Sequence, residues 1–326
     1  MEEDVIKSRV VGVDISNERT TYAIVDIRGN IIAEDGFTTS EYPDISEFVT
    51  KLSESMIALM EANGGFMSVR SVGISCPSAD SLTGSIVNAP NLPWKGVVPL
   101  AAMLRDRMGM AVALGNDAHV AALGEYSYGI AHGMNDFVVV SIGVGVGSSF
   151  FSHGRGHKGF RGFSGEVGHA CIVDYGRKCG CGKEGCLEAY CGAKGIVQTA
   201  REVMAENSAP SLMSQQERLS PRTIAACCDQ GDELAIEVYR RTGYLLGIGL
   251  ANYASIVDPQ AIILTGGISH AGKWLLEPLR KSFDEHVFQN MRGDIKIIVS
   301  RLNDHEREVL GSSALAWEVP EYSLFK

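Results

Sequence analysis

The apolar positions of the chain follow the two-residue period of strands in some segments and the 3.6-residue period of helices in others. In the first third, nearly continuous apolar runs bounded by turn residues predict strands at 9–15, 21–26, from 31, at 69–75 and at 111–114. Apolar residues that recur on one face predict helices from Ser46 as N-cap to Gly64-Gly65, at 99–108, and from Asn116 onward. Strands and helices that alternate in this way are typical of an α/β domain.

The same order of elements begins again after Asp136. Apolar runs predict strands at 137–142, 148–153, 261–264 and 296–299, and helical spacing predicts helices at 232–253, 274–283 and 306–317. The polar stretch 206–221 predicts a surface loop. A repeated order of elements predicts two α/β domains of related plan, with a ligand cleft between them. We expect domains at 1–117 and 118–304, with the closing helix of 305–326 packed on the first.

Composition and charge narrow the class of protein. The chain has 326 residues, 45% of them hydrophobic and 21% charged, which suits a globular protein of two domains. The 39 acidic residues exceed the 29 basic ones by ten, so a nucleic-acid or anionic-membrane partner is disfavoured. No apolar run approaches the roughly 20 residues of a membrane span, and the charged start MEEDVIKSR does not resemble a signal peptide. These features predict a cytoplasmic protein without a membrane partner.

Five of the eight cysteines fall within 21 residues, between Cys171 and Cys191. Three of these thiols, in the string CGCGKEGC, follow His169 by ten or more residues. Together they are a set typical of structural Zn²⁺: His169, Cys179, Cys181 and Cys186. Because four protein ligands leave no position for water, a catalytic zinc hydrolase is disfavoured. The alternative is a loop of free thiols, and the remaining cysteines are interpreted as core or surface residues.

Acidic and amide side chains lie near this cluster and near one strand end. Glu166 and Glu188 flank the metal set, where fixed acceptors suit adjacent hydroxyls such as those of a sugar. Asp117, after Asn116, occupies a strand-to-helix turn where a general base is often found, and Asn91 lies in a proline-punctuated loop. Each residue also has a structural alternative: helix N-cap for Asn116 or Asp117, solvated helix position for Glu188, and turn residue for Asn91.

Successive motifs, GNDAHVAALGE, GVGVG, GEVGH, CGCGKEGCLEAY and LTGG, resemble those of the ROK (repressor, open reading frame, kinase) family in order and over essentially the whole chain. The resemblance implies a two-domain actin-like ATPase (ribonuclease-H-like) fold with a cleft, and a sugar kinase or sugar-responsive repressor. It implies Asp117 as the base that deprotonates a hexose hydroxyl, commonly the 6-OH. The implied sugar ligands are Asn91, Asn116, Glu166, His169 and Glu188, with His169 also bound to zinc. Family members are often dimers or tetramers, so a homo-oligomer is expected.

For the nucleotide, the resemblance implies ATP with Mg²⁺ at Asp14, Gly143, Gly145, Gly147, Gly266 and Gly267. The chain departs from the family at two places. Ser16-Asn17-Glu18 replaces a Gly-Gly-Thr turn, and Val144 replaces a threonine. A carboxylate about 4 Å from a phosphate costs on the order of 4 kcal/mol at an effective dielectric of 20. That cost corresponds to about a thousandfold in affinity unless Mg²⁺ or Arg19 neutralises it.

Two functions therefore remain. The first, which we favour, is ATP-dependent phosphorylation of glucose, mannose or an N-acetylhexosamine. The second is a sugar-binding sensor or regulator that has lost phosphoryl transfer. Repressors of the family carry an N-terminal helix-turn-helix module, whereas about eight residues precede the first expected strand here, so we expect no direct binding to nucleic acid.

Overall fold

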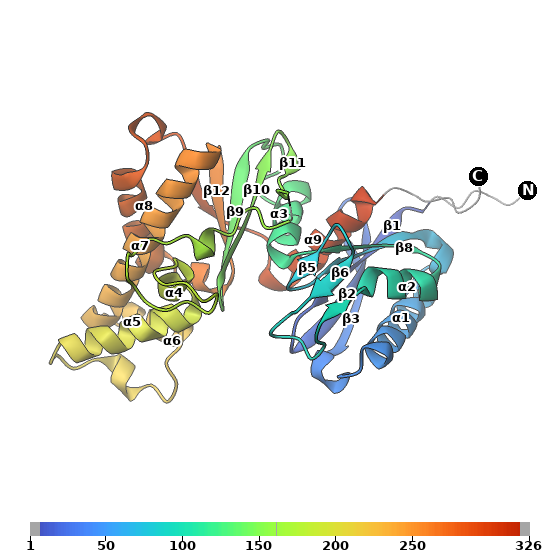
Figure 1. Cartoon of the computed structure of the whole chain (residues 1–326), viewed down its shortest axis with the longest axis horizontal. Helices are drawn as coiled ribbons and strands as arrows, with labels where there is room; N and C mark the ends of the chain where they lie inside the picture. The colour runs from blue at the N-terminus through green and yellow to red at the C-terminus, as the bar shows by residue number, and fades with distance from the viewer. Residues whose placement is uncertain (1–6, 161, 320–326) are drawn as a thin grey trace, which may run out of the picture. The chain divides into compact units, whose positions relative to one another are not determined.

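The computed structural model describes residues 7–160 and 162–319. The chain divides into two compact units (Figure 1). The N-terminal unit holds the residues up to Gly133 together with those from Arg301 onward, and the C-terminal unit is Met134–Ser300. The sequence pattern predicts this boundary earlier, at residue 117. Helix α3 (Asp117–Ser127) stays with the N-terminal unit because it packs on α9 (Asp304–Glu318), which in turn contacts the first sheet. Residues 320–326 of the expected closing segment lie outside the described residues.

The sheet of the N-terminal unit has the strand order β3-β2-β1-β4-β8. Its first three strands are antiparallel neighbours, and β4 and β8 run parallel to β1. The strands are β1 (Arg9–Ile15), β2 (Arg19–Asp26), β3 (Ile31–Thr38), β4 (Val69–Ser75) and β8 (Ala111–Gly115). The short strands β5 (Ala79–Asp80), β6 (Ser85–Val87) and β7 (Val97–Val98) form a small second sheet.

Helices cover both faces of this first sheet. Val11 and Val13 of β1 join the apolar core that also holds buried residues of α1 (Ile45–Ala62) and α2 (Leu100–Met108). The alternate residue Val10 packs with Val309 of α9 on the other face. Gly12 allows α9 to lie close, because a Cβ there would be 2.2 Å from Val309 O. The closing helix therefore fixes the strand that ends near Asp14.

The sheet of the C-terminal unit, β11-β10-β9-β12-β13, repeats the same order and the same strand directions. Its strands are β9 (Phe137–Ile142), β10 (Val146–Ser152), β11 (Arg155–Gly156), β12 (Ala261–Thr265) and β13 (Lys296–Val299). Its helices are α4 (Glu188–Cys191), α5 (Ala193–Glu206), α6 (Pro221–Asp229), α7 (Glu233–Val257) and α8 (Lys273–His286). The prediction of two α/β domains of related plan is confirmed.

Most expected strands and helices are present with bounds shifted by a few residues, but one expected N-cap is wrong and two helices were not predicted. The N-cap of α1 is Asp44, whose side chain accepts from the N–H groups of Ser46 and Glu47, so Ser46 is not the cap. No helix was predicted at α5 or α6, although their buried residues, among them Ile196 and Val203 of α5 and Ile224 of α6, recur at helical spacing. The expected surface loop at 206–221 is present between α5 and α6 with most of its residues exposed, and a short 3₁₀ turn within it buries Met213.

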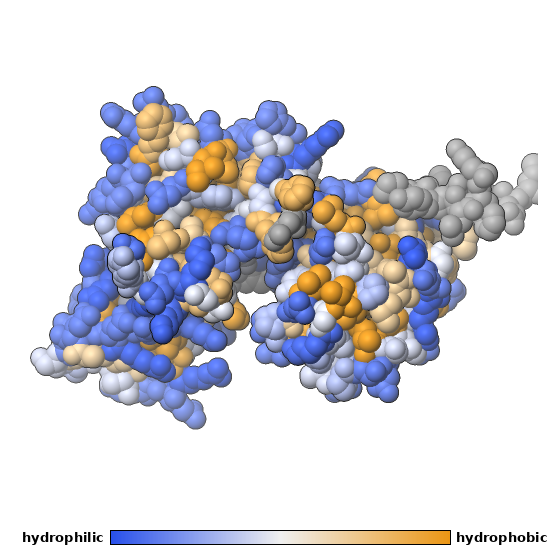
Figure 2. Space-filling view, viewed as in Figure 1, coloured by the Kyte–Doolittle hydropathy of each residue, from blue (hydrophilic) through white to orange (hydrophobic). Residues whose placement is uncertain are grey.

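The surface is mixed in character. On the face drawn in Figure 2, hydrophilic side chains surround small hydrophobic patches. Among the described residues, no helix combines the length and the apolar composition that crossing a bilayer requires.

Candidate functional site

Residues 178–186, here called the cysteine hairpin, form a short loop that presents three thiols. Lys178 and Glu184 face each other across its stem, and Cys179 N–H donates to Lys183 O at 2.8 Å. Gly182 turns the chain at a φ of 90°, a left-handed conformation that glycine adopts without strain. The tight turn brings the cysteine side chains together.

The predicted metal ligands converge. One ligand atom from each of His169, Cys179, Cys181 and Cys186 lies within 4.8 Å of all the others. Cys181 Sγ is 3.7 Å from Cys186 Sγ, and Cys179 Sγ is 3.7 Å from His169 Nδ1. Two sulfurs bound tetrahedrally to one Zn²⁺ at about 2.3 Å lie about 3.8 Å apart, so the donor set and its spacing fit zinc.

The protonation of the cluster also bears on metal binding. Burial, reinforced by the neighbouring thiols of Cys181 and Cys179, raises the pKa of Cys186 to about 12. A thiol with that pKa keeps its proton at neutral pH unless a cation stabilises the thiolate. Metal binding at these residues would therefore release protons.

Protein contacts attach the cysteine hairpin and the preceding Arg177 to the rest of the C-terminal unit. Lys183 Nζ donates to His169 O at 2.8 Å. The guanidinium of Arg177 lies 4.6 Å from the ring of Tyr190, pairs with Glu202, and donates to Gly195 O at 3.0 Å. Sequence reasoning missed Arg177, since nothing adjacent in the chain identifies partners that come from α4 and α5.

Glu188 joins the cysteine hairpin to the turn between β9 and β10. Its Oε2 accepts from Val146 N–H at 3.0 Å, and its Oε1 is 3.9 Å from Cys179 Sγ. A Cβ on Gly145 would lie only 2.3 Å from the same Oε2, so glycine makes room for the carboxylate. Glu188 is half-buried and hydrogen-bonded, and the alternative of a solvated helix position is wrong.

His169 ends the short 3₁₀ turn Val167–His169, which packs on β10, and Glu166 is the N-cap of that turn. Gly168 permits this approach because a Cβ there would lie 2.0 Å from Val146 O. Val146 thus meets Glu188 through its N–H and the 3₁₀ turn through its carbonyl. Glu166 itself is exposed, and His169 directs Nδ1 to the thiols. The structure brings these three predicted sugar ligands to one region of the C-terminal unit.

Two glycine turns lie side by side at the carboxyl ends of β9 and β12, which are parallel neighbours. The first contains Gly143 and Gly145, and Gly147 is already within β10. The second begins at Gly266, where φ is 84° and a Cβ would lie 2.6 Å from Ile142 O. Val144, at the tip of the first turn, is 80% exposed. Backbone turns at this edge of a parallel sheet commonly bind phosphates.

In the N-terminal unit, Asn116 and Asp117 lie where β8 leads into α3. Asn116 is the N-cap, and its Oδ1 is 3.1 Å from Ala118 N, while Asp117 Oδ1 is 2.8 Å from the same nitrogen. The N-cap alternative therefore holds for Asn116. Its Oδ1 is used by the helix, which leaves the Nδ2 donors as the part suited to a ligand oxygen.

Asp14 and Asp117 lie close enough for their charges to interact. Burial raises the pKa of Asp14 well above its usual value, and the carboxyl of Glu308 on α9, then Asp117, adds to this rise. The Asp117 side chain is exposed by surface area but surrounded by protein at longer range. That surrounding protein raises the Asp117 pKa, although the Ala118 N–H opposes the rise. A raised pKa suits a carboxylate that accepts a proton near neutral pH.

Asn91 lies apart from these residues in sequence, in the loop between β6 and β7. The loop is anchored by Leu92 and Trp94, which are buried in the apolar core, and Trp94 Nε1 donates to Tyr42 O at 3.2 Å. Asn91 is exposed on this anchored loop. Asn91 is thus a turn residue, which is the alternative given for it above, and its amide is exposed to a ligand.

The turn Ser16-Asn17-Glu18, where the chain departs from the family's motif, connects β1 to β2 just after Asp14. Ser16 closes it, since its Oγ donates to Arg19 O at 2.9 Å and its N–H donates to the same oxygen at 3.0 Å. Asn17 and Glu18 are exposed at the tip, and the Arg19 guanidinium lies beside Gly36 of β3. Side chains therefore cover a turn that glycine would leave open.

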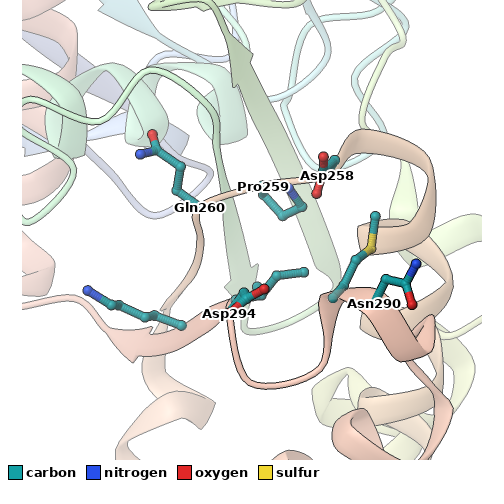
Figure 3. A pocket seen from close by; sticks show the side chains of 8 residues that line it. Asp258, Pro259, Gln260, Asn290 and Asp294 are labelled. Carbon is teal, nitrogen blue, oxygen red and sulfur yellow. The ribbon is translucent and has the colours of Figure 1, made fainter.

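A cavity of about 470 Å³ lies at the other end of the C-terminal unit's sheet, where the parallel strands β12 and β13 begin (Figure 3). Its lining comes from the segments that precede β12 and β13: Asp258, Pro259, Gln260, Asn290, Met291, Asp294, Ile295 and Lys296. The glycine turns follow β9 and β12 instead. No predicted site residue lines this cavity, so it is separate from the candidate site.

Two sheets of the same order, three antiparallel strands followed by two parallel ones, with acidic and glycine turns at the carboxyl ends, define the class as an actin-like ATPase. The chain belongs to the ROK family, whose model matches residues 10–319. The sequence is 29% identical over 318 residues to a glucokinase from Streptomyces coelicolor, covering 94% of this chain and 97% of the relative. It is 25% identical to a xylose repressor from Caldicellulosiruptor bescii, covering 96% of this chain and 80% of the repressor.

A solved structure supports the same class. The ROK family glucokinase from Streptomyces griseus, in complex with glucose and AMPPNP, superposes with a TM-score of 0.78. It is 28% identical in sequence, and the match covers 95% of this chain and all of that one. These relatives support a sugar kinase, while the xylose repressors leave a regulatory role open.

Proposed function

We propose that the protein transfers the γ-phosphoryl group of ATP to a hydroxyl of a hexose, with Asp117 as the general base. The observation that carries the proposal is the placement of Asp117, at the first turn of α3 and within charge range of Asp14, with a raised pKa. Asp117 accepts the hydroxyl proton as the sugar oxygen attacks the γ-phosphorus, and ADP leaves. Such a reaction depends mainly on positioning and charge neutralisation.

The sugar would be bound by carboxylate and imidazole groups that the protein holds in place. Glu188 is oriented by Val146 N–H, and His169 with Nδ1 toward the thiols has Nε2 left to meet a hydroxyl. Glu166 extends from the same turn, and the amides of Asn116 and Asn91 would supply further donors. Glucose, mannose and N-acetylhexosamines share the hydroxyl pattern that such a set recognises, and the 6-OH is the proposed acceptor.

We further propose that His169, Cys179, Cys181 and Cys186 hold a structural Zn²⁺. The thiol and imidazole spacing supports this assignment. With all four positions filled by protein, the ion would fix the cysteine hairpin rather than take part in chemistry. By fixing the cysteine hairpin, the ion would also hold Glu188, two residues beyond Cys186, in position to bind the sugar.

For the nucleotide, the two glycine turns at the ends of β9 and β12 would bind the phosphates through backbone N–H groups. Asp14 offers a carboxylate oxygen of the kind that Mg²⁺ prefers, and bound Mg²⁺ would neutralise phosphate charge. The residues assigned to this role are Asp14, Gly143, Gly145, Gly147, Gly266 and Gly267.

A coupled assay with ATP, Mg²⁺ and a panel of glucose, mannose, N-acetylglucosamine and N-acetylmannosamine tests the proposal. Turnover of one of these sugars that Asp117→Asn removes would support the kinase. A protein that binds a hexose in calorimetry, yet shows neither turnover nor ATP binding, would overturn it.

One specific observation favours a second function, a sugar-binding sensor. Asn17 and Glu18 cover the turn after Asp14, and Val144 offers no hydroxyl at the tip of the glycine turn after β9. Both changes would weaken phosphate binding and leave the sugar ligands intact. The calorimetric result described above, sugar binding without ATP binding, is the outcome that would favour this role.

A further inference from the structure

Cys171 is a thiol outside the proposed metal set that lies directly opposite one of its members. Cys171 and Cys186 are partners in an antiparallel bridge. The hydrogen bonds of this bridge belong to the flanking residues: Ile172 N–H donates to Gly185 O at 2.9 Å, and Leu187 N–H donates to Ala170 O at 3.0 Å. The two cysteines are therefore a non-hydrogen-bonded pair.

In antiparallel strands, the Cα atoms of a non-hydrogen-bonded pair are closer together than those of a hydrogen-bonded pair. Directly opposed residues in a non-hydrogen-bonded pair have Cα atoms about 4.5 Å apart. Disulfides form across Cα separations of about 4.4–6.8 Å. The backbone at Cys171 and Cys186 thus already has a spacing that a disulfide spans without rearrangement of the strands.

The Cys171 thiol lies beside the paired segment, 3.6 Å from Val173 O. A Cβ built on Gly185 would lie 2.9 Å from Cys171 Sγ, so the thiol lies against the residue that precedes Cys186. Cys171 is exposed, whereas Cys186 is buried. An oxidant in solvent therefore reaches Cys171 directly, and Cys186 is the residue directly opposite across the bridge, which the Cys171 sulfur would meet after its side chain rotates away from Val173 O.

We propose that Cys171 is an oxidation site through which a peroxide converts Cys171 and Cys186 to a disulfide and so removes a ligand from the zinc set. This inference rests on the zinc site proposed above. In the first step the Cys171 sulfur attacks a peroxide oxygen, the O–O bond breaks, and Cys171 becomes a sulfenic acid. In the second step the Cys186 sulfur attacks Cys171 Sγ, the S–O bond breaks, and water leaves. Overall, two thiols and one hydrogen peroxide give one disulfide and two waters.

Loss of Cys186 from the metal set would act on the sugar residues. Three ligands would remain where a closed zinc site has four, so zinc would dissociate more readily. Glu188 follows Cys186 by two residues and is hydrogen-bonded to Val146. A cysteine hairpin released from the metal would position that carboxylate less firmly, which couples oxidation to sugar affinity.

The test uses the full-length protein purified with zinc, with hydrogen peroxide as the probe. Zinc content is measured first by elemental analysis, and release is then followed with a chromogenic chelator. Non-reducing peptide mapping identifies which cysteines become linked. Wild-type protein is compared with Cys171→Ser and Cys171→Ala, and with Asp174→Asn as a control that changes an exposed neighbour and retains every thiol.

We expect a peptide in which Cys171 is joined to Cys186, and zinc release about tenfold slower in both Cys171 variants, because an adjacent thiol reacts far faster than a distant one. The Asp174→Asn control should match wild type. Zinc release at the wild-type rate in both Cys171 variants, or linked peptides that lack Cys171, would overturn the inference. A protein without zinc before oxidation would instead refute the metal assignment, and the peptide map would still decide whether Cys171 pairs with Cys186. Neither readout depends on phosphoryl transfer.

Discussion

The Glu188 carboxylate and the Val146 N–H are 3.0 Å apart, and this hydrogen bond joins the cysteine hairpin to the glycine turn after β9. Glu188 follows the last proposed metal ligand by two residues, and Val146 follows Gly145. One contact therefore connects a proposed metal site, a proposed sugar ligand and a proposed phosphate turn. A substitution at any one of these three sites should therefore alter the geometry of the other two.

Gly145→Ala and Gly143→Ala are a matched pair that tests this connection. A Cβ at Gly145 would lie 2.3 Å from Glu188 Oε2, whereas a Cβ at Gly143 meets nothing within 4 Å. The obstructed atom ends a flexible side chain, so we expect Gly145→Ala to change the free energy of unfolding little and to displace the carboxylate. Loss of a charged hydrogen bond to a sugar hydroxyl corresponds to about a tenfold or larger rise in Kd.

Calorimetry with the preferred hexose and urea unfolding measure both quantities. Gly143→Ala should leave sugar affinity close to wild type. Equal affinities in the two alanine variants would show that Glu188 does not bind the sugar from this position.

Asp117→Asn should reduce kcat by about a hundredfold or more while the sugar Kd stays near the wild-type value, because a general base contributes to the transition state. The wild-type pH profile offers a second readout. The base must be ionised to act, and the Asp117 pKa is raised. Activity should therefore fall on the acid side at a pH above the value of about 3.9 typical of free aspartate. A kcat unchanged by the substitution would remove Asp117 from the reaction.

The sequence predicted the two sheets well because buried strands such as β9 and β12 carry strong apolar runs that need no partner to be identified. It also predicted that the side chains of His169, Cys179, Cys181 and Cys186 converge, since three thiols in eight residues lie close together. It did not predict the position of Arg177 or the bond between Glu188 and Val146, because these contacts join residues 12 to 42 positions apart. Such pairings depend on how α4, α5 and β10 pack, and hydrophobic periodicity does not report that packing.

Two helices were not predicted although the sequence carries their signal. Apolar residues recur at helical spacing in α5 (Ile196, Ala200 and Val203) and in α6 (Ile224, Cys227 and Cys228). The roles of Asn116 and Asp117 were also undecided in sequence, since either residue is a good N-cap. The structure assigns the cap to Asn116.

Cys181→Ser should lower zinc content and sugar affinity together. Cys181 Sγ lies 3.7 Å from Cys186 Sγ, and a serine oxygen is a poorer zinc ligand than a thiolate. Elemental analysis gives the zinc content, and calorimetry gives the sugar Kd. The control is Cys227→Ser, which changes a buried thiol of α6 outside the metal set. Full zinc stoichiometry in Cys181→Ser would reject this ligand assignment, and sugar affinity unchanged after zinc loss would separate the metal from Glu188.

Asp14→Asn should stabilise the protein at neutral pH while it removes phosphoryl transfer. The pKa of Asp14 is raised by burial and by the carboxyls of Glu308 and Asp117. A carboxyl group whose pKa is higher in the folded than in the unfolded chain destabilises the folded protein as the pH rises from the unfolded to the folded pKa. The full penalty is present above the folded pKa. Asparagine carries no charge at any of these pH values, so the penalty disappears, with a gain of about 1 kcal/mol expected at pH 7.

Urea unfolding of wild type, Asp14→Asn and the exposed-site control Asp284→Asn measures this gain. The advantage of Asp14→Asn should shrink as the pH falls from about 7 to about 4.5, because wild-type Asp14 then takes up a proton and escapes the repulsion. The control should show no such trend. A variant that is less stable than wild type at pH 7 would mean that the Asp14 carboxylate is held by favourable contacts, and that the crowding of carboxylates at the end of β1 carries no cost.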